Sequence, residues 1–321
     1  MSESKDLKTL QQELQQALSL INDYSATHND TSKAVLDTDG LNNTQSLLER
    51  CAAVVNADNG NTKPTLRIIH HFACSGGTLI SKCLAAQPNV FLLSELHPTT
   101  RLGMNMEKAA YTPRDITTQA MYGRVPNVDE LAEKLFVNGI IETEKHIRER
   151  GGYLVIRAHT HADYCTDNPI PEVDTLTRLL EPHFDIKHLV TVRNPIDSFM
   201  SLRDNGWMHF KPDSFDEYCG RLLKFLEPFD KEQIIKYEAF VEKPETELKH
   251  ITEILGMNEG SDDLEYIDIF RISGDSGRTG IEIKPRSRKE VSDDLEREIA
   301  KSASFKTFCS QYNYTESNAN K

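Results

Sequence analysis

Long hydrophobic runs are missing from this 321-residue sequence. No stretch approaches the roughly eighteen apolar residues of a membrane-spanning helix, and the start, MSESKDLKTLQQELQQ, lacks the basic and apolar regions of a signal peptide. The six cysteines are irregularly spaced and form no C-x-x-C pair, which argues against a zinc site or a disulfide framework. These absences predict a cytoplasmic protein with reduced thiols and no membrane partner.

Positive charge is outnumbered, with 37 Lys and Arg against 50 Asp and Glu. The net charge of −13 argues against a general nucleic-acid binder, because binding a polyanion requires a broad positive field. One segment, 271–289, departs from this trend, since it contains six Lys and Arg residues and two acidic ones, a net charge of +4. The segment is either a solvated basic loop or a site for a small anionic ligand.

The first sixty residues read as an appendage. Apolar residues at three- and four-residue spacing predict an amphipathic helix over 5–24, and a shorter helix follows at 41–56. A polar linker then runs to Pro64. We therefore expect an N-terminal helical extension over 1–62, packed on the main domain of 63–321 or serving self-association as a homo-oligomer.

Short apolar strands alternate with helices from Leu66 onward. This alternation predicts an α/β fold with a central parallel sheet flanked by helices on both faces. Ligands of such sheets bind outside the carboxyl ends of the strands. The expected strands are 66–72, 90–93, 153–157, 186–192 and 233–237, and the expected helices are 78–86, 128–150, 172–181, 195–204, 214–228 and 243–256.

A glycine-rich turn joins the first strand to the first of these helices. Its sequence is A-C-S-G-G-T-L at 73–79. A turn of this kind aims backbone N–H groups and the positive end of a helix dipole at one point, which suits a phosphate or sulfate. It is not a Walker A motif, because Gly77 stands where that motif has lysine before Thr78. The segment predicts anion binding and disfavours an ATPase or GTPase.

A second motif follows the strand at 186–192. It reads R-N-P-I-D-S-F-M-S and runs from Arg193 to Ser201, with Pro195 suited to a first helical turn. Arginine offers a two-pronged donor and serine a hydroxyl, a suitable pair for a phosphate monoester. Together with the first loop, this motif resembles the sulfotransferase family and its P-loop-like fold.

The resemblance implies 3'-phosphoadenosine 5'-phosphosulfate (PAPS) as sulfuryl donor and 3',5'-ADP as product. It assigns the 5'-phosphosulfate to the first loop and the 3'-phosphate to Arg193 and Ser201. A Y-E-x-x-x-x-x-P segment assigns an adenosine contact to Tyr237, and a small-Gly-Arg loop near the C-terminus resembles the one that closes over the 3'-phosphate. The implied donor-binding residues are therefore Cys74, Ser75, Gly76, Gly77, Thr78, Leu79, Arg193, Ser201, Tyr237, Ser276, Gly277 and Arg278.

Sulfuryl transfer needs a base for the acceptor proton and positive groups on the sulfonate. The resemblance makes Glu95, after the second strand, the leading candidate base, and His97 is the alternative. The chain departs from the family in having Cys74 where Lys or Arg is usual and Gly77 where Thr is usual. Arg157, at the end of the third strand, is the best replacement cation, with His159 as a further catalytic candidate.

Other interpretations stay open at this stage. His159, His161 and Asp163 resemble a metal cluster but lack a further ligand set, so no metal is expected. A non-catalytic scaffold on a degenerate sulfotransferase fold, or a kinase-like phosphotransferase, would also carry these loops. The acceptor hydroxyl or amine, on a glycan, peptide or small metabolite, cannot be read from the sequence.

Overall fold

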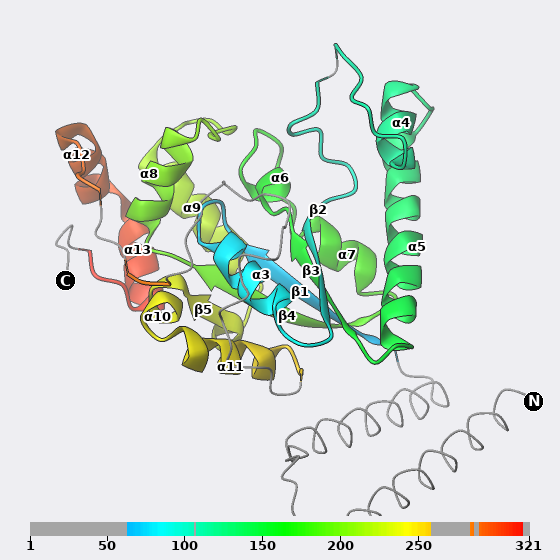
Figure 1. The fold of residues 1–321 in the computed structure, drawn as a ribbon. Helices are drawn as coiled ribbons and strands as arrows, with labels where there is room; N and C mark the ends of the chain where they lie inside the picture. Colours follow the sequence, from blue (N-terminus) through cyan, green and yellow to red (C-terminus); the bar gives the residue numbers. More distant parts are fainter. Residues whose placement is uncertain (1–62, 106, 258–282, 286–288, 317–321) are drawn as a thin grey trace, which may run out of the picture. The chain divides into compact units, whose positions relative to one another are not determined.

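The computed structural model describes residues 63–105, 107–257, 283–285 and 289–316 (Figure 1). Five strands follow one another along the chain, and the helices between them connect each strand to the next. The strands are β1 (Thr65–His71), β2 (Val90–Leu96), β3 (Tyr153–Ala158), β4 (Asp185–Val192) and β5 (Ile234–Lys236). The connecting helices are α3 (Gly77–Ala85), α4 (Ile116–Tyr122), α5 (Val128–Arg148), α6 (His161–Tyr164), α7 (Thr175–Leu180), α8 (Pro195–Asp204), α9 (Phe215–Leu226) and the 3-10 turn η1 (Lys231–Gln233). The helices after β5 are α10 (Tyr237–Glu242), α11 (Pro244–Ile254), α12 (Asp293–Lys301) and α13 (Ala303–Tyr312).

The strands form one sheet in the order β2-β3-β1-β4-β5. Every pairing in it is parallel, with Ile68 opposite Ile156 of β3 and His188 of β4. β1 is covered on both faces and is buried from Leu66 to His71, as expected for a central parallel strand. The predicted α/β fold is confirmed.

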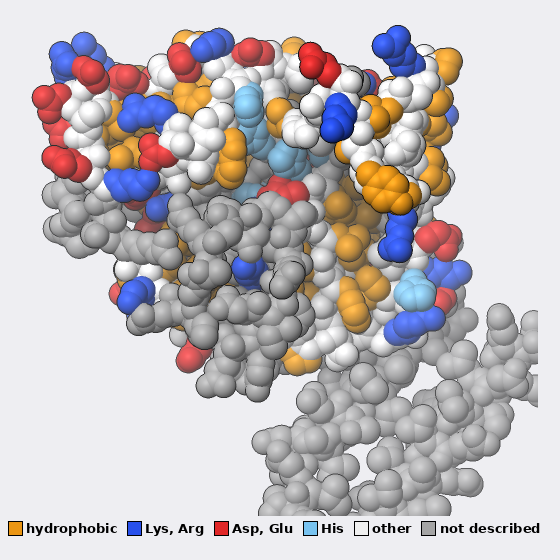
Figure 2. Space-filling view, turned by 45° about the horizontal axis from the view of Figure 1, so that its top comes forward, with side chains coloured by type: hydrophobic (Ala, Val, Ile, Leu, Met, Phe, Trp, Pro, Cys, Tyr) orange, Lys and Arg blue, Asp and Glu red, His pale blue; other side chains and the backbone are white. Residues whose placement is uncertain are grey.

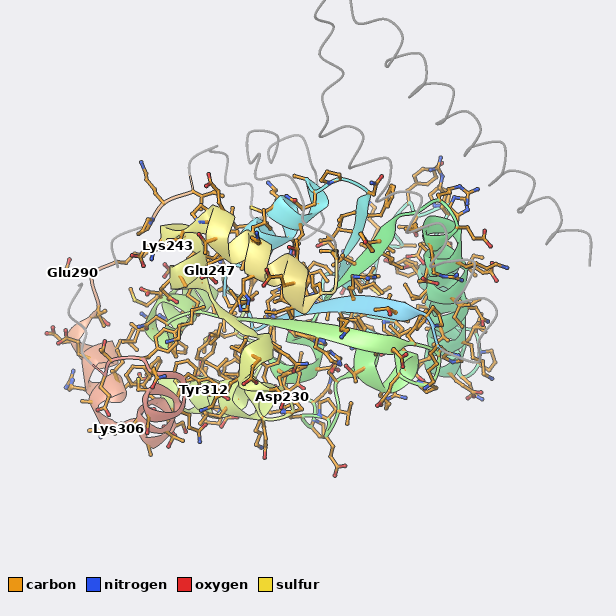
Figure 3. All side chains as sticks on the ribbon, turned by 90° about the horizontal axis from the view of Figure 1, so that it is seen from below. Asp230, Lys243, Glu247, Glu290, Lys306 and Tyr312 are labelled. Atoms are coloured by element: carbon orange, nitrogen blue, oxygen red, sulfur yellow. The ribbon has the colours of Figure 1, made fainter. Side chains whose placement is uncertain are left out.

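Helices cover both faces of the sheet (Figure 3). On one face, α3, α10 and α11 pack on Ile69 and Leu189, and the labelled Glu247 lies in α11, just after its N-cap Lys243. On the other face, α5 and α7 cover Ile68, while α9, α12 and α13 cover Val190. Alternate residues of one strand thus enter opposite cores, as the two-residue period of a strand requires.

Local sequence explains where several helices begin. Asn194 caps α8 by accepting a hydrogen bond from the Ile196 N–H at 3.0 Å, and Pro195 occupies the first helical position, where a missing N–H costs nothing. In α5, acidic residues lie in the first turn and basic ones in the last, which complements the helix dipole. The predicted helix over 195–204 is therefore confirmed to the residue.

Some elements were predicted with the wrong bounds, and others were not predicted. The expected strand over 233–237 ends at Lys236, because Tyr237 begins α10, a helix that was not predicted. The expected helix over 172–181 is shorter and begins at Thr175, after its N-cap Asp174. α4, α6, α12 and α13 were also not predicted. The helices expected at 5–24 and 41–56 lie outside the described residues.

The parallel order brings the carboxyl ends of all five strands to one edge of the sheet. The first loop, His159 and Arg193 follow β1, β3 and β4 there, and Glu95 is the last residue but one of β2, which runs beyond its predicted end at 93. Within the described parts of the chain, no helix is both long enough and apolar enough to cross a membrane.

Candidate active site

The first loop, 73–79, is a tight turn that leads into the N-terminus of α3. The Ser75 N–H donates to the Phe72 carbonyl at 3.1 Å, and Cys74 and Gly76 both adopt positive φ, of 63° and 88°. Gly76 is the N-cap of α3 and has no side chain to satisfy the helix, so N–H groups of the first turn remain directed at the loop. This arrangement suits an anion.

Two aromatic rings press against the glycines of this loop. A Cβ atom added to Gly76 would lie 2.1 Å from Cδ2 of Tyr237, and one added to Gly77 would lie 2.4 Å from Cγ of His71. Both distances are far below any real contact, so neither position accepts a side chain without movement. The loop hydroxyls also have partners, since Ser75 Oγ lies 3.1 Å from Thr191 Oγ1 of β4.

The second loop adjoins the first, as the sequence predicted. Nη1 of Arg193 donates to the Cys74 carbonyl at 3.4 Å, and its Cζ lies 5.0 Å from the centre of the Tyr237 ring. The Ser198 hydroxyl, which sequence reasoning missed, lies 3.5 Å from the same carbonyl. Ser201 lies one turn further along α8 and is half-buried. Arg193 and the first loop therefore share one site.

Glu238, in the first turn of α10 after β5, holds the second loop by a hydrogen bond. Its Oε1 accepts from the Asn194 N–H at 2.8 Å, and its Oε2 accepts from the Tyr314 hydroxyl at 2.8 Å. The glutamate of the Y-E segment thus has a structural role that the motif alone did not indicate. Its carboxylate connects the start of α8 to the C-terminal segment after α13.

Glu95 and Arg157 meet at the ends of neighbouring strands. Nη2 of Arg157 lies 2.6 Å from Oε1 of Glu95 and donates to the Thr78 hydroxyl at 3.1 Å, and Nη1 donates to Ser94 Oγ at 3.2 Å. Only 4% of the Arg157 side chain is exposed. Because Thr78 belongs to the first turn of α3, this guanidinium reaches the first loop from β3.

His159 completes the cluster on the other side of Glu95. Its Nδ1 lies 2.6 Å from Oε2 of Glu95, so the carboxylate has a partner at each oxygen. Burial alone raises the pKa of Glu95, but the contacts with His159, His71 and Arg157 hold that pKa well below its ordinary value. Glu95 is therefore a carboxylate at neutral pH, and its backbone sits at a positive φ of 58°.

Histidine rings extend this cluster toward the surface. The ring centres of His159 and His161 lie 6.1 Å apart, and those of His161 and His209 lie 5.4 Å apart. Figure 2 shows histidine side chains gathered at the centre of the face turned to the viewer. Burial and the neighbouring His159 and His209 lower the pKa of His161 to about 4, which keeps this ring neutral.

His97, the alternative base, has another function. Its Nδ1 accepts from the backbone N–H groups of Thr99 and Thr100 at 3.3 and 3.1 Å, and its Nε2 lies 3.2 Å from Oδ1 of Asp163. Both ring nitrogens thus hold the turn that follows β2. Asp163 is engaged by His97 and Thr175, and no group of residues in the described ranges is arranged to hold a metal ion.

The last predicted motif cannot be located. Ser276, Gly277 and Arg278 lie outside the described residues, as does most of the basic segment 271–289. Lys289 is described, and its Nζ lies 2.5 Å from Oδ2 of Asp204 at the end of α8.

The comparison with known protein families matches this architecture. The model of the sulfotransferase family matches residues 69–261, which is more than half of the chain and includes both loops. This chain belongs to the sulfotransferase family. A comparison with curated proteins finds no match.

Solved sulfotransferase structures are similar to this chain over most of its length. The sulfotransferase domain from the curacin biosynthetic pathway is 18% identical, with a TM-score of 0.46 over 79% of this chain and 99% of that chain. The sulfotransferase domain from the Synechococcus PCC 7002 olefin synthase is 16% identical, with a TM-score of 0.47 over 78% and 96%. Mouse sulfotransferase SULT7A1 complexed with PAP is 13% identical, with a TM-score of 0.38 over 79% and 86%.

Proposed function

We propose that this sulfotransferase moves the sulfuryl group of PAPS to a hydroxyl or amine of an acceptor and releases 3',5'-ADP. The observation that carries the proposal is the meeting of the first loop with Arg193 on one side and with the Glu95–Arg157 pair on the other. A nucleotide with phosphates at both ends requires two anion sites, and a transferred group requires a cation and a base between donor and acceptor.

The two loops would hold the nucleotide. The N–H groups at the start of α3 suit the 5'-phosphosulfate, and Cys74, Ser75, Gly76, Gly77, Thr78 and Leu79 form that turn. Arg193, with Ser201 on the following helix, suits the 3'-phosphate. Tyr237 lies between Gly76 and Arg193, the place for an aromatic contact with the adenosine. Ser276, Gly277 and Arg278 stay predicted contributors to the 3'-phosphate site.

Arg157 would supply the cation that the first loop lacks at Cys74. Its guanidinium is buried, touches Thr78 and stays charged at every relevant pH. Positive charge fixed in a buried site stabilises the charge that develops on the sulfonate and on the leaving phosphate oxygen. In the reaction the acceptor atom forms a bond to sulfur, and the bond from sulfur to the bridging oxygen breaks.

The acceptor proton would pass to the pair of His159 and Glu95. Glu95 was expected to be the base by itself, but its depressed pKa makes it a weak one. With Nδ1 of His159 directed at Glu95, the opposite ring nitrogen takes the proton, and the carboxylate stabilises the imidazolium that forms. His159 is also the more exposed of the two, with 24% of its side chain accessible against 17% for Glu95.

The test is to incubate the protein with PAPS and panels of glycans, peptides and small metabolites while 3',5'-ADP release is measured. Titration calorimetry with 3',5'-ADP separates an enzyme from a scaffold, because a scaffold on a degenerate fold binds no nucleotide. A parallel incubation with ATP and Mg²⁺ tests the kinase-like alternative, which predicts transfer from ATP. Absence of 3',5'-ADP binding by the folded protein at millimolar concentration would reject the proposal. Cytoplasmic location and self-association through an N-terminal extension over 1–62 also remain predictions.

A further inference from the structure

His71 occupies the space that a side chain at position 77 would fill. It is the last residue of β1 and only 6% exposed. A Cβ at Gly77 would lie 2.4 and 2.6 Å from Cγ and Cδ2 of this ring. The His71 ring fits only because Gly77 has no side chain. In the sequence, Gly77 indicated only a departure from the threonine that is usual in the family.

The same ring contacts the guanidinium of Arg157. Nε and Nη2 of Arg157 lie 3.1 and 2.9 Å from Nε2 of His71. The Nε–H group of Arg157 is directed at this ring, since Nε also lies 3.4 Å from Nδ1 of His71. Arginine has no acceptor atom. A nitrogen of His71 that bonds this guanidinium is therefore an acceptor, and Nε2 is the nearer of the two ring nitrogens.

We propose that His71 is a positioning residue for sulfuryl transfer: its ring replaces the missing side chain at Gly77, and its Nε2 fixes the guanidinium of Arg157 against the first loop. The proposal rests on the proposed function, in which Arg157 replaces the loop cation. It explains two departures from the family together, since Cys74 removes the local cation and the His71–Gly77 pair holds the substitute in place.

The electrostatics favour a neutral His71 ring, although the contact with Glu95 acts in the opposite direction. Burial and the charge of Arg157 lower the pKa of His71 to about 4, so the ring is neutral at physiological pH. A neutral imidazole holds a guanidinium without repelling it. The facing groups are Arg157 and Glu95 from the strand ends and Gly77 from α3, with Nε2 of His71 3.4 Å from Oε1 of Glu95.

Two substitutions separate the acceptor nitrogen from the shape of the ring. His71→Phe keeps a flat ring beside Gly77 but has no acceptor, whereas His71→Gln keeps an oxygen acceptor. We expect His71→Phe to lower kcat by about tenfold to hundredfold, as misplacement of a reacting group does, with the Kd for 3',5'-ADP changed by less than about threefold. His71→Gln should recover most of that loss.

The matched control is His70→Phe. His70 precedes His71 on β1, is fully buried and faces the opposite side of the sheet, where it contacts His188 and Phe229. Its substitution should leave kcat unchanged once Tm shows that the protein is folded. The proposal is overturned if His71→Phe has normal kcat, if the Phe and Gln variants lose kcat equally, or if His70→Phe loses as much as His71→Phe.

A double-mutant cycle tests the packing of the His71 ring against Gly77 and needs no assay of activity. Gly77→Ala should destabilise the protein by urea unfolding, because its Cβ meets the ring, and should cost much less in a His71→Ala background. If the losses in unfolding free energy of the two variants simply add, the two positions are not coupled and the packing part of the proposal is overturned. If the cycle shows this coupling but the wild-type protein binds no 3',5'-ADP, the proposed function is rejected and the packing of His71 on Gly77 still holds.

Discussion

Nδ1 of His159 and Oε2 of Glu95 lie 2.6 Å apart, at the ends of two neighbouring parallel strands. A hydrogen bond this short between a ring nitrogen and a buried carboxylate fixes the orientation of the imidazole. It also makes the two side chains one functional unit, in which loss of either partner impairs the other.

Glu95→Gln is therefore expected to lower kcat by about a hundredfold or more, since a correctly placed acid–base group contributes roughly that factor. Binding of 3',5'-ADP should be nearly unchanged, because the proposal assigns its phosphates to the loop N–H groups and to Arg193, not to this carboxylate. His159→Phe should show the same pattern. Steady-state kinetics and calorimetry measure both quantities.

The control for this pair is Glu133→Gln. Glu133 lies 2.6 Å from Arg178 in a comparable ion pair on the surface, and its loss should not alter kcat. Near-normal turnover of Glu95→Gln would mean that the base is misassigned. Near-normal turnover of His159→Phe would mean that His159 does not take the acceptor proton and that Glu95 alone is the base.

Arg193→Ala should weaken 3',5'-ADP binding by about tenfold to hundredfold, the usual worth of a hydrogen-bonded charge at a phosphate. Arg203→Ala is the matched control, since Arg203 is an exposed arginine in the last turn of the same helix. Calorimetry with 3',5'-ADP gives the two dissociation constants. Equal affinities for wild type and Arg193→Ala would show that the second loop does not hold the nucleotide.

Gly76→Ala should damage the first loop. The residue has a φ of 88° and no room for a Cβ beside Tyr237, so the change costs about 1–2 kcal/mol of backbone strain plus the displacement of the ring. Gly139→Ala in α5 is the control, because nothing lies within 4 Å of its Cβ and alanine favours a helix. Urea unfolding should show destabilisation at 76 and slight stabilisation at 139, and 3',5'-ADP binding should fall only for the first. Unchanged binding by Gly76→Ala would contradict the loop assignment.

The protein should lose stability in mild acid. Burial lowers the pKa of His70, His71 and His161 from 6.5 to about 4 in the folded chain. Between these values the unfolded chain binds protons that the folded chain does not, so the free energy of unfolding falls as the pH drops from 6.5 toward 4, by roughly 1 kcal/mol per histidine for each pH unit.

Urea unfolding at pH 7.5, 6.0 and 5.0 measures this slope. His70→Phe should make the slope shallower, because one buried histidine no longer titrates, whereas His183→Phe, at an exposed position, should leave it unchanged. An identical slope for wild type and His70→Phe would contradict the assignment of a neutral buried ring.

The main strands were predictable because each is an apolar run between turn residues. β1 and β4 lie within one residue of their expected ends. α12 and α13 were missed although signals were present: Ser292 and Ser302 cap them, and Leu295 with Ile299 marks a buried stripe. Sheet order was not predictable, because it depends on contacts between segments far apart in the chain.

The two loops and their meeting followed from local motifs and the rule for parallel sheets. The cluster beside them did not, because it depends on β2 lying next to β3, which brings Glu95 to Arg157 and His159. His71 carried a weak signal, a histidine at a strand end immediately before the loop. Nothing local indicated that its ring would fill the space above Gly77.

The central place of β1 in the sheet has a consequence for synthesis on the ribosome. This strand is made before both of its partners, because β3 and β4 begin at Tyr153 and Asp185. A nascent chain that has not yet exposed the second partner leaves one side of an apolar strand without backbone hydrogen bonds. Assembly of the domain therefore waits on distant segments, and truncated or stalled chains are the form most exposed to aggregation.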